Sequence, residues 1–514
     1  PRAVHLDDEI YRVLADLGVA EAFADITMPT LGLRLIDAKQ RTMAEFRRSD
    51  PVGVYGFPPA NMFDQPDLER VLRDRLSQLS DATLVGGTEL VAVEQGTGDD
   101  EGLLLARLRT LATGEEHLVR ARAVLGCDGA NSTVRDIIGA TFEDLGFEER
   151  WLVADVRCEQ ELPIWQGVHQ LCDPRRAGTL MRVGPDRYRW EFRLKDDETP
   201  EQLLASGALA TLVQPWLGGV RFDDLEVLKR AEYTFKARIA DRWREGRMFL
   251  LGDAAHLTPP FIGQGLCAGL RDAANLTWKL AAVLQGRAHE SLLDTYEHER
   301  RPHAKALVKK AVMIGWAMTG GQDGAAHVRR AALAVATRLP GVSDKVLDAN
   351  PPRFADGAAV SRAGRRDRVT GGLLPQPQVG ADGRRVRLDE ATGPGHLVLV
   401  AGEPDPGLVQ AADSFGARVV RVVGPGAAAG AVAGPARTDG PAGTRVVIDD
   451  DGTLLAWFRR SGTSAVLVRP DHVVQARETG RAARPGAVLA AQLQEWSRRM
   501  SWQPAASSTA GGAR

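Results

Sequence analysis

The sequence has few cysteines, and they are scattered. Among its 514 residues there are four: Cys127, Cys158, Cys172 and Cys267. No two of them form a C-x-x-C pair, which argues against both a metal site and a disulfide scaffold. Such usage is typical of a protein from the reducing cytoplasm. We therefore expect a cytoplasmic protein without a metal ion.

The sequence also lacks a membrane span and an excess of charge of one sign. Its long apolar stretches are interrupted by Arg, Lys or Asp, which argues against a transmembrane helix. Lys and Arg total 65 and Asp and Glu total 67, so the net charge is −2. This balance predicts neither nucleic acid nor an anionic membrane as a partner. The length indicates two or three domains.

A third absence is the glycine loop that usually opens a dinucleotide-binding fold. No G-x-G-x-x-G lies before Gly126, although such folds normally begin with one. Gly424 to Gly430 has similar spacing, but its Ala- and Gly-rich context predicts a surface loop. The chain opens at Pro1 without Met, and our interpretation is that about 40 residues are missing before it. The alternative is a flavin-free relic that serves as a binding module.

The most informative stretch runs from Gly252 to Gly265 and reads Gly-Asp-Ala-Ala-His-Leu-Thr-Pro-Pro-Phe-Ile-Gly-Gln-Gly. It follows an apolar run, Met248 to Leu251, that predicts a buried strand, and it precedes a helical pattern from Leu266 to Gln285. A loop of this kind suits a large cofactor, because the first N–H groups of a helix are free to bind it. Asp253 is placed to bind a ribityl or ribose hydroxyl.

A second stretch, from Ala123 to Arg135, again predicts a strand, a glycine turn and a helix start. Ser132 and Thr133 are suitable helix caps, and Arg135 is suitable for a phosphate. Without a ligand, the same residues would form a capped strand–turn–helix unit.

Together these stretches resemble two flavin motifs of the FAD-dependent aromatic hydroxylases, the class A flavoprotein monooxygenases. The resemblance implies an α/β fold, in which a Rossmann-like FAD-binding domain carries an inserted, mostly antiparallel substrate-domain sheet. It implies FAD and NADH or NADPH as cofactors, with a small aromatic substrate and O2, and it is compatible with a homodimer. Hydroxylation in this family proceeds through a flavin C4a-hydroperoxide that is kept away from water.

The resemblance also implies a set of FAD-binding positions: Arg2, Gln65, Asp128, Gly129, Arg135, Gly252, Asp253, Pro260, Gly263, Gly265, Leu266 and Cys267. Arg2 is otherwise a solvated charge, and Gln65 is otherwise a polar loop residue. Cys267 departs from the Asn that many members have, but a backbone contact to the ring can replace the amide. His256 is expected to pack beneath the flavin loop.

The opening segment, Val4 to Glu9, most resembles the branch of the 3-(3-hydroxyphenyl)propionate hydroxylases. That branch has Gly where this chain has His5. In phenol hydroxylase relatives, an Asp at the register of Asp7 lies beside the phenol hydroxyl, so Asp7 is a candidate proton acceptor. Asp8 and His5 are further candidates. Both aspartates are also good helix N-caps, and that interpretation stays open.

The order of predicted elements divides the chain into an FAD-binding domain (1–150), a substrate sheet (151–245), an FAD-domain return with helices (246–340), a linker (341–384), a thioredoxin-like domain without C-x-x-C (385–502) and a disordered tail (503–514). We expect one strand over 119–125, a helix break at Pro302, a hairpin turn over 449–452 and a strand over 454–458. Arginines on substrate-sheet strands could hold a substrate carboxylate: Arg175, Arg182, Arg189 and Arg193.

The sequence therefore predicts an NAD(P)H- and FAD-dependent monooxygenase. It would hydroxylate a phenolic ring, of the 3-(3-hydroxyphenyl)propionate type, in aromatic catabolism. A hydroxylase of polyketide or antibiotic aromatics is the alternative enzyme, and His5 is the residue that favours an altered pocket.

Overall fold

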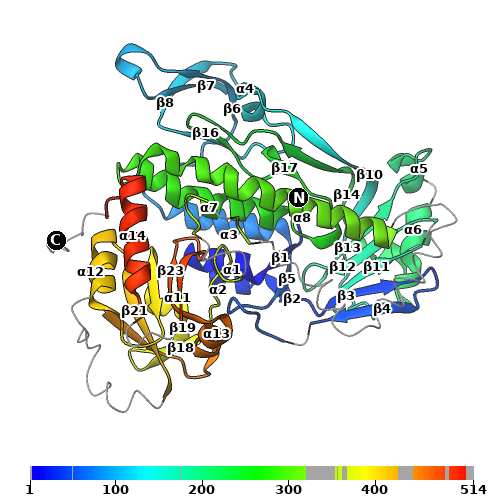
Figure 1. The fold of residues 1–514 in the computed structure, drawn as a ribbon. Helices are drawn as coiled ribbons and strands as arrows, with labels where there is room; N and C mark the ends of the chain where they lie inside the picture. The colour runs from blue at the N-terminus through cyan, green and yellow to red at the C-terminus, as the bar shows by residue number, and fades with distance from the viewer. Residues whose placement is uncertain are drawn as a thin grey trace. The chain divides into compact units, whose positions relative to one another are not determined.

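The computed structural model of the protein describes residues 3–48, 50–173, 175–205, 207–319, 353–355, 357–361, 367–425, 444–480 and 485–504. The chain forms two compact units. The first comprises Pro1–Gly53, Phe57–Arg271 and Ala304–Pro351, and the second comprises Val54–Gly56, Asp272–His303 and Pro352–Arg514. Helices and sheets occur in both units, so the predicted α/β fold class is confirmed (Figure 1).

An eight-stranded sheet dominates the first unit, in the order β17-β14-β10-β13-β12-β11-β3-β4 (Figure 1). Its strands are β3 (Gly32–Ile36), β4 (Thr42–Arg47), β10 (Phe142–Arg157), β11 (Val168–Leu171), β12 (Gly178–Arg182), β13 (Arg187–Arg193), β14 (Glu226–Ala240) and β17 (His256–Leu257). All neighbours pair antiparallel except β11 and β3. The mostly antiparallel sheet is thus confirmed, and it also includes β3 and β4 from early in the chain.

Alternation along the strands explains how this sheet builds its core. In β10, Leu152, Ala154 and Val156 are buried in one cluster, together with Trp190 and Phe192 of β13. Successive side chains of a strand point to opposite faces, so every second residue meets the same core. Two short helices contribute apolar side chains to this cluster: α5 (Pro200–Ala205) and α6 (Ala208–Val213).

Three smaller sheets contain the other described strands of the first unit. They are β1 (His5–Asp7) with β5 (Ala60–Phe63) and β2 (Thr27–Pro29); β6 (Thr88–Gln95) with β7 (Leu104–Thr110) and β8 (Glu116–Ala121); and β15 (Arg244–Glu245) with β16 (Met248–Leu250) and β9 (Val124–Gly126). The strand predicted over 119–125 is therefore divided between two sheets. Because β9 and β16 pair in parallel, the two motif loops that follow them leave the same edge of their sheet.

Short helices lie between these strands, and two long helices follow the stretch from Gly252 to Gly265. They are α1 (Asp8–Asp16), α2 (Ala20–Ala24), α3 (Gln65–Ser77), α4 (Thr133–Ile137), α7 (Gly265–Leu284) and α8 (Asp294–Thr319). The predicted break at Pro302 is wrong, because Pro302 lies inside α8. A proline inside a helix removes one backbone bond and costs about 3 kcal/mol. Buried side chains on either side, Glu299 and His303 among them, offset that cost.

The second unit contains a seven-stranded sheet in the order β19-β18-β22-β21-β20-β23-β24. Its strands are β18 (Gln378–Ala381), β19 (Arg384–Arg387), β20 (Leu397–Val400), β21 (Arg418–Val423), β22 (Thr444–Ile448), β23 (Thr463–Val468) and β24 (Val474–Thr479). Its helices are α11 (Leu388–Thr392), α12 (Pro406–Phe415), α13 (Thr453–Ser461) and α14 (Ala487–Met500). β20 and β21 pair in parallel, whereas β23 is antiparallel to β20 and β24. The order β21-β20-β23-β24 is that of the predicted thioredoxin-like fold, and its segment has no cysteine.

The strand predicted over 454–458 is a helix, α13. Leu454 and Phe458 are both buried, and residues four apart share one helix face. Gly452 and Gly462 flank the helix in the left-handed conformation, which glycine adopts without steric cost. The hairpin turn expected over 449–452 was also wrong, because this turn leads from β22 into α13.

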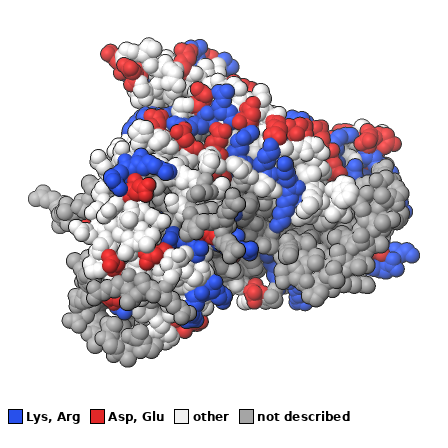
Figure 2. Space-filling model, in the orientation of Figure 1, with Lys and Arg blue, Asp and Glu red and all other residues white. Residues whose placement is uncertain are grey.

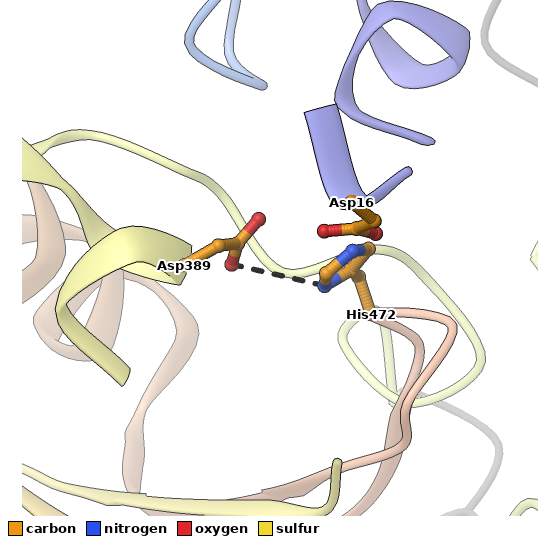
Figure 3. Close-up of side chains that lie close together, drawn as sticks. All are labelled: Asp16, Asp389 and His472. Atoms are coloured by element: carbon orange, nitrogen blue, oxygen red, sulfur yellow. Dashed lines mark ion pairs between the residues drawn. The ribbon is translucent and has the colours of Figure 1, made fainter. Parts of the chain in front are cut away.

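The turn between β23 and β24 carries a histidine with an unusual backbone. His472 has φ 61°, and its Nδ1 lies 3.7 Å from Oδ1 of Asp389 in α11 (Figure 3). This ion pair depends on protonation of the histidine. It connects the turn to α11 within the second unit.

Some predictions fall on residues outside the described ones: Arg2, residues 320–340 of the FAD-domain return, residues 341–352, 356 and 362–366 of the linker, residues 426–430 of the Gly424 loop and the tail from 505. In the described part of the chain, we find no helix with the length and apolar character needed to cross a membrane. Basic and acidic side chains of described residues are interspersed on the face shown in Figure 2.

Candidate functional site

The loop after β16 has the backbone geometry of a ligand cradle. Gly252 and Gly263 have φ values of 59° and 62°, a region that favours glycine. Asp253 lies in a short 3-10 turn, and Pro260 opens a second one. Helix α7 begins at Gly265, so its first N–H groups face the loop without partners in their own helix. Free N–H groups at a helix N-terminus favour negative charge.

The second motif is connected to this loop by Arg135. Its Nη1 donates to the carbonyl oxygen of Ala254 at 3.2 Å, and Nη2 donates to that of Ala130 at 3.0 Å. The Arg135 guanidinium also lies 4.0 Å from the ring centroid of Phe142. The side chain is buried. In this structure Arg135 therefore joins the two motif loops.

The turn that contains Arg135 is capped as the sequence predicts for Ser132. Ser132 is the N-cap of α4, and its Oγ accepts from the N–H of Arg135 at 2.9 Å. Asp128 Oδ2 accepts from the N–H of Val134 at 3.0 Å. Gly129, with φ 80°, lets the chain turn between these groups. Asp128 and Gly129 thus hold the loop at the end of β9.

The opening segment of the chain packs directly on the loop of the first motif. His5 Nδ1 lies 3.3 Å from the carbonyl oxygen of Gly263. A Cβ placed on Gly263 would come 3.0 Å from that same nitrogen, so a larger residue would be crowded at this contact. Cys267 is fully buried, and its Sγ donates to the His5 carbonyl at 3.9 Å. Its neighbour Leu266 packs against the apolar cluster around α1.

Asp7 is the N-cap of α1, as the capping interpretation predicts. Its Oδ1 accepts from the N–H of Ile10 at 3.0 Å, and its Oδ2 accepts from Arg271 Nη2 at 2.5 Å. Burial alone would raise the pKa of Asp7, but the charge and hydrogen bonds of Arg271 and the Ile10 N–H outweigh it. They hold the pKa below its ordinary value. Asp8, the first residue of α1, is also buried.

Arg271 of α7 joins three groups at the site. Besides Asp7, its Nε donates to Glu9 Oε2 at 2.7 Å, and its Nη1 donates to Gln264 Oε1 at 2.7 Å. Burial opposes its charge, yet Asp7 and Glu9 raise the pKa of Arg271. The guanidinium is therefore a fixed cation between the opening segment and the motif loop.

Gln264, the middle residue of Gly-Gln-Gly, is fully buried with its amide orientation set by Arg271. Its Nε2 has no hydrogen-bond partner among the described residues. An unpaired buried donor is costly, and it fits a ligand that brings an acceptor. The pyrimidine carbonyls of a flavin are acceptors of that kind, so the loop residues fit FAD on chemical grounds.

His5 also begins a row of side chains across the sheet β1-β5-β2. It pairs with Met62 of β5, which in turn pairs with Met28 of β2. Directly paired residues of antiparallel strands point to one face. Met28 and Met62 line a pocket of about 280 Å³, part of it open to solvent. Its other lining residues are Pro29, Thr30, Gln166, Gly167, Val168, Met181 and Arg182.

The burial of His5 sets its protonation state. Desolvation lowers its pKa, Asp7 opposes this, and the charges of Arg48 and Arg271 lower it further. The net shift is downward, so the imidazole is neutral at pH 7. Because a carbonyl oxygen only accepts, the contact with Gly263 requires the proton on Nδ1, which leaves the lone pair on Nε2.

Two other predicted positions have protein partners. Gln65 Oε1 accepts from the N–H of Ala3 at 2.9 Å, and Nε2 donates to Glu69 at 2.8 Å. His256 is buried, with its ring centroid 5.3 Å from that of Trp243, so it packs beneath the loop as expected. Gln65 thus positions the opening segment.

Each of the four arginines predicted to be available for a substrate carboxylate has an acidic partner, and Arg175 lies between β11 and β12 rather than on a strand. The pairs are Arg175 with Asp173, Arg182 with Glu161, Arg189 with Asp155, and Arg193 with Glu149. Sequence reasoning missed Arg271, Gln264 and Arg48. Arg271 and Asp7 lie 264 positions apart, and no local pattern indicates such a pair.

Comparison with known proteins gives two family matches. The family described as "FAD binding domain" matches residues 1–311, and the one described as "HcaD C-terminal domain" matches residues 371–494. The "3-(3-hydroxy-phenyl)propionate/3-hydroxycinnamic acid hydroxylase" of Burkholderia cenocepacia (strain HI2424) is 34% identical, over 96% of this chain and 89% of that protein. The "Probable NADH-specific resorcinol 4-hydroxylase" of Rhodococcus jostii (strain RHA1) is 34% identical, over 78% and 72% respectively.

A solved structure is also similar over nearly the whole chain. It is a ternary complex of aklavinone-11 hydroxylase with FAD and aklavinone, with a TM-score of 0.73 and 26% identity. The match covers 96% of this chain and 91% of that one.

Proposed function

The chain belongs to the FAD binding domain family and is an FAD-dependent aromatic hydroxylase; from this premise, we propose that its substrate is a phenolic ring with a carboxylate side chain. The type compound is 3-(3-hydroxyphenyl)propionate. The observation that carries the proposal is the 34% identity to a hydroxylase named for that substrate, over 96% of this chain.

FAD would be held by the two motif loops. We assign its ring end to the segment from Gly263 to Cys267, with the Gln264 amide and the α7 N-terminus as donors. Asp253 would accept from a ribityl hydroxyl. Asp128, Gly129 and Arg135 would support the neighbouring loop. When bound, FAD would transfer electrons from NADH or NADPH to O2, and one atom of that O2 would enter the ring.

We propose His5 as the group that accepts the phenolic proton. Its Nε2 carries the lone pair, its ring is fixed by Gly263, and its lowered pKa keeps it unprotonated at pH 7. Removing the phenolic proton raises the electron density of the ring, and general-base assistance is worth about 10²–10⁴-fold. Asp7 is less suitable, because its carboxylate is already bound by Ile10 and Arg271.

A larger polycyclic ring is the second candidate substrate. It is favoured by the similarity to aklavinone-11 hydroxylase and by His5, which differs from the Gly expected in the phenylpropionate branch. The two candidates differ in size and in charge, so a substrate panel separates them.

The test is NAD(P)H oxidation by the FAD-loaded protein with 3-(3-hydroxyphenyl)propionate, 3-hydroxycinnamate, resorcinol and an anthracycline-type aglycone. We expect the two phenolic acids to stimulate oxidation most and to yield hydroxylated products. Stimulation by the aglycone alone would exclude the phenolic acids as substrates. Comparing NADH with NADPH in the same assay assigns the nicotinamide cofactor.

A further inference from the structure

We propose that Arg48 binds the carboxylate of the substrate. Arg48 directly follows β4 in the first unit, and its Nε is buried without a hydrogen-bond partner among the described residues. The inference rests on the proposed function, because it assumes an aromatic substrate that carries an acid group. It names the residue that would select that group.

Arg48 differs from two other arginines whose Nε is also buried without a hydrogen-bond partner. Nε of Arg421 and Nε of Arg477 are also buried without a standard hydrogen bond, but ion pairs with Glu403 and Asp367 compensate them. We find no such pair for Arg48 among the described residues. A buried guanidinium nitrogen without an acceptor is costly, and a ligand carboxylate would supply one.

Arg48 also belongs to the site by its electrostatics. Burial lowers the pKa of Arg48, and the charges of Asp8 and Asp7 oppose that shift. Its positive charge in turn acts on His5. His5 contacts Gly263 of the motif loop, so Arg48 acts on the same residue that borders the ring end of the cofactor site. A phenol next to His5 would have its acid side chain available for Arg48.

The loop around Arg48 is closely packed near this position. A Cβ on Gly53 would come 2.1 Å from Asp8 Oδ2, so the chain just beyond Arg48 lies directly against Asp8. Backbone bonds from Arg48 N–H to Leu31 at 2.8 Å and from Gly53 N–H to Phe57 at 2.7 Å hold the loop. The guanidinium is thereby presented from a fixed backbone.

The competing holder of the carboxylate is Arg182, which lines the pocket. The N–H groups of its guanidinium already donate to acceptors of the protein. Nη1 bonds to Glu161 at 2.6 Å, Nε bonds to the Gly184 carbonyl at 3.1 Å, and Nη2 bonds to the Pro185 carbonyl. Substrate binding there would have to break existing bonds, whereas Nε of Arg48 has no acceptor among the residues that the structure describes. The choice between these arginines is open to direct measurement.

The experiment titrates the FAD-loaded protein with 3-phenylpropionate and with its neutral amide, 3-phenylpropanamide, and follows the flavin absorbance change. Neither probe carries the phenol, so binding is measured without turnover. We expect wild type to bind the acid at least tenfold more tightly than the amide. Arg48→Met should weaken acid binding by about 10- to 100-fold, the range for a hydrogen bond to a charged group, and leave amide binding within about threefold. Arg48→Lys should retain part of the preference, and Arg182→Met should retain all of it.

Thermal unfolding and flavin content of each variant show whether it is folded. The proposal is overturned if wild type does not prefer the acid, if Arg48→Met weakens both probes equally, or if Arg182→Met removes the preference instead. Equal weakening, with a lower unfolding temperature, would mean that Arg48 only balances Asp8. Failure of the proposed function is a separate result: phenolic acids would then give no hydroxylated product in wild type, whatever the binding preference.

Discussion

His5 and Asp7 lie on the same face of β1, yet their surroundings give them opposite acid–base properties. Asp7 accepts hydrogen bonds from Ile10 and Arg271. The positive charge of Arg271 balances the carboxylate, and the pKa of Asp7 is lowered. His5 has one carbonyl partner at Nδ1, and burial keeps it neutral. A carboxylate whose oxygens already accept hydrogen bonds is suited to positioning neighbouring groups, whereas a neutral imidazole can accept a proton.

This difference predicts a pH profile. The pKa of His5 lies below its ordinary value of 6.5, so its basic form is present at neutral pH and is lost as the pH falls through the lowered pKa. In wild type, kcat/KM for a phenolic substrate should therefore fall on the acid side, below pH 6.5. His5→Gln should lower kcat by about 10²–10⁴-fold and remove that limb.

The matched control is His117→Gln, which changes an exposed histidine on β8. It should leave both the rate and the profile unchanged. An acid limb that persists in His5→Gln would assign the titration to another group, with Asp8 as the next candidate.

At the scale of elements, Arg271 links α7 to the opening segment through ion pairs. It bonds to Asp7, Glu9 and Gln264, all from a side chain that is only 4% exposed. Removing one member of a buried ionic group leaves the others uncompensated and typically costs about 3–5 kcal/mol. Arg271→Met should lower the free energy of unfolding by that amount and should release FAD more readily.

Denaturant unfolding and flavin retention on dilution measure the two effects. Arg175→Met is the control, because that side chain is 80% exposed and pairs with Asp173; such surface pairs contribute about 0–1 kcal/mol. If Arg271→Met is as stable as the control and keeps its flavin, Arg271 does not stabilise the contact between α7 and the opening segment.

The elements also show which features a sequence can predict. The two motif loops and the alternating strands β10–β13 follow local patterns, so they could be predicted. The run Leu454–Phe458 is short and apolar, and such a run suits a strand or a helix equally. Packing of Leu454 and Phe458 on one face selects the helix. The joining of β3 to β11 depends on residues far apart in the chain.

The same limit applies to the site. Motif residues such as Asp253 and Gly263 are recognisable where they stand. Arg271 and Arg48 acquire their roles only when the fold brings them to Asp7 and His5. The capping role of Asp7 could be predicted from its place before α1, whereas its bond to Arg271 could not.

At the scale of the whole molecule, the second unit contains its own buried ionic group. Glu299 Oε2 accepts from Lys279 Nζ at 2.8 Å, and Glu299 Oε1 accepts from Arg469 Nη1 at 2.7 Å. Asn275 and Asp471 complete the group. Burial alone would raise the pKa of Glu299, but Arg469 and Lys279 outweigh it and lower the pKa to about 2. Burial lowers the pKa of Lys279 to about 8.

The lowered pKa of Glu299 predicts an acid-sensitive contribution to stability. A carboxylate of this kind stabilises the fold above its unfolded pKa of about 4.5, and the contribution is lost as the pH falls toward 2. Glu299→Gln should destabilise by about 3–5 kcal/mol at pH 7, because Lys279 and Arg469 lose their partner. The difference from wild type should shrink between pH 4.5 and 2.

Urea unfolding at pH 7, 4 and 3 checks this prediction, with Glu390→Gln as the control. Glu390 pairs with Arg387 and is 52% exposed, so its replacement should change stability little. A difference for Glu299→Gln that stays constant with pH would contradict the assigned charge state.

The most direct test of the central claim is a coupling measurement on the FAD-loaded protein. NAD(P)H oxidation, O2 consumption, hydrogen peroxide and hydroxylated product are followed together with 3-(3-hydroxyphenyl)propionate. We predict that the substrate accelerates NAD(P)H oxidation and that one hydroxylated product forms for each NAD(P)H and each O2 consumed, with little hydrogen peroxide. Oxidation that the phenolic acid does not accelerate, or that yields hydrogen peroxide without a hydroxylated ring, would contradict the account.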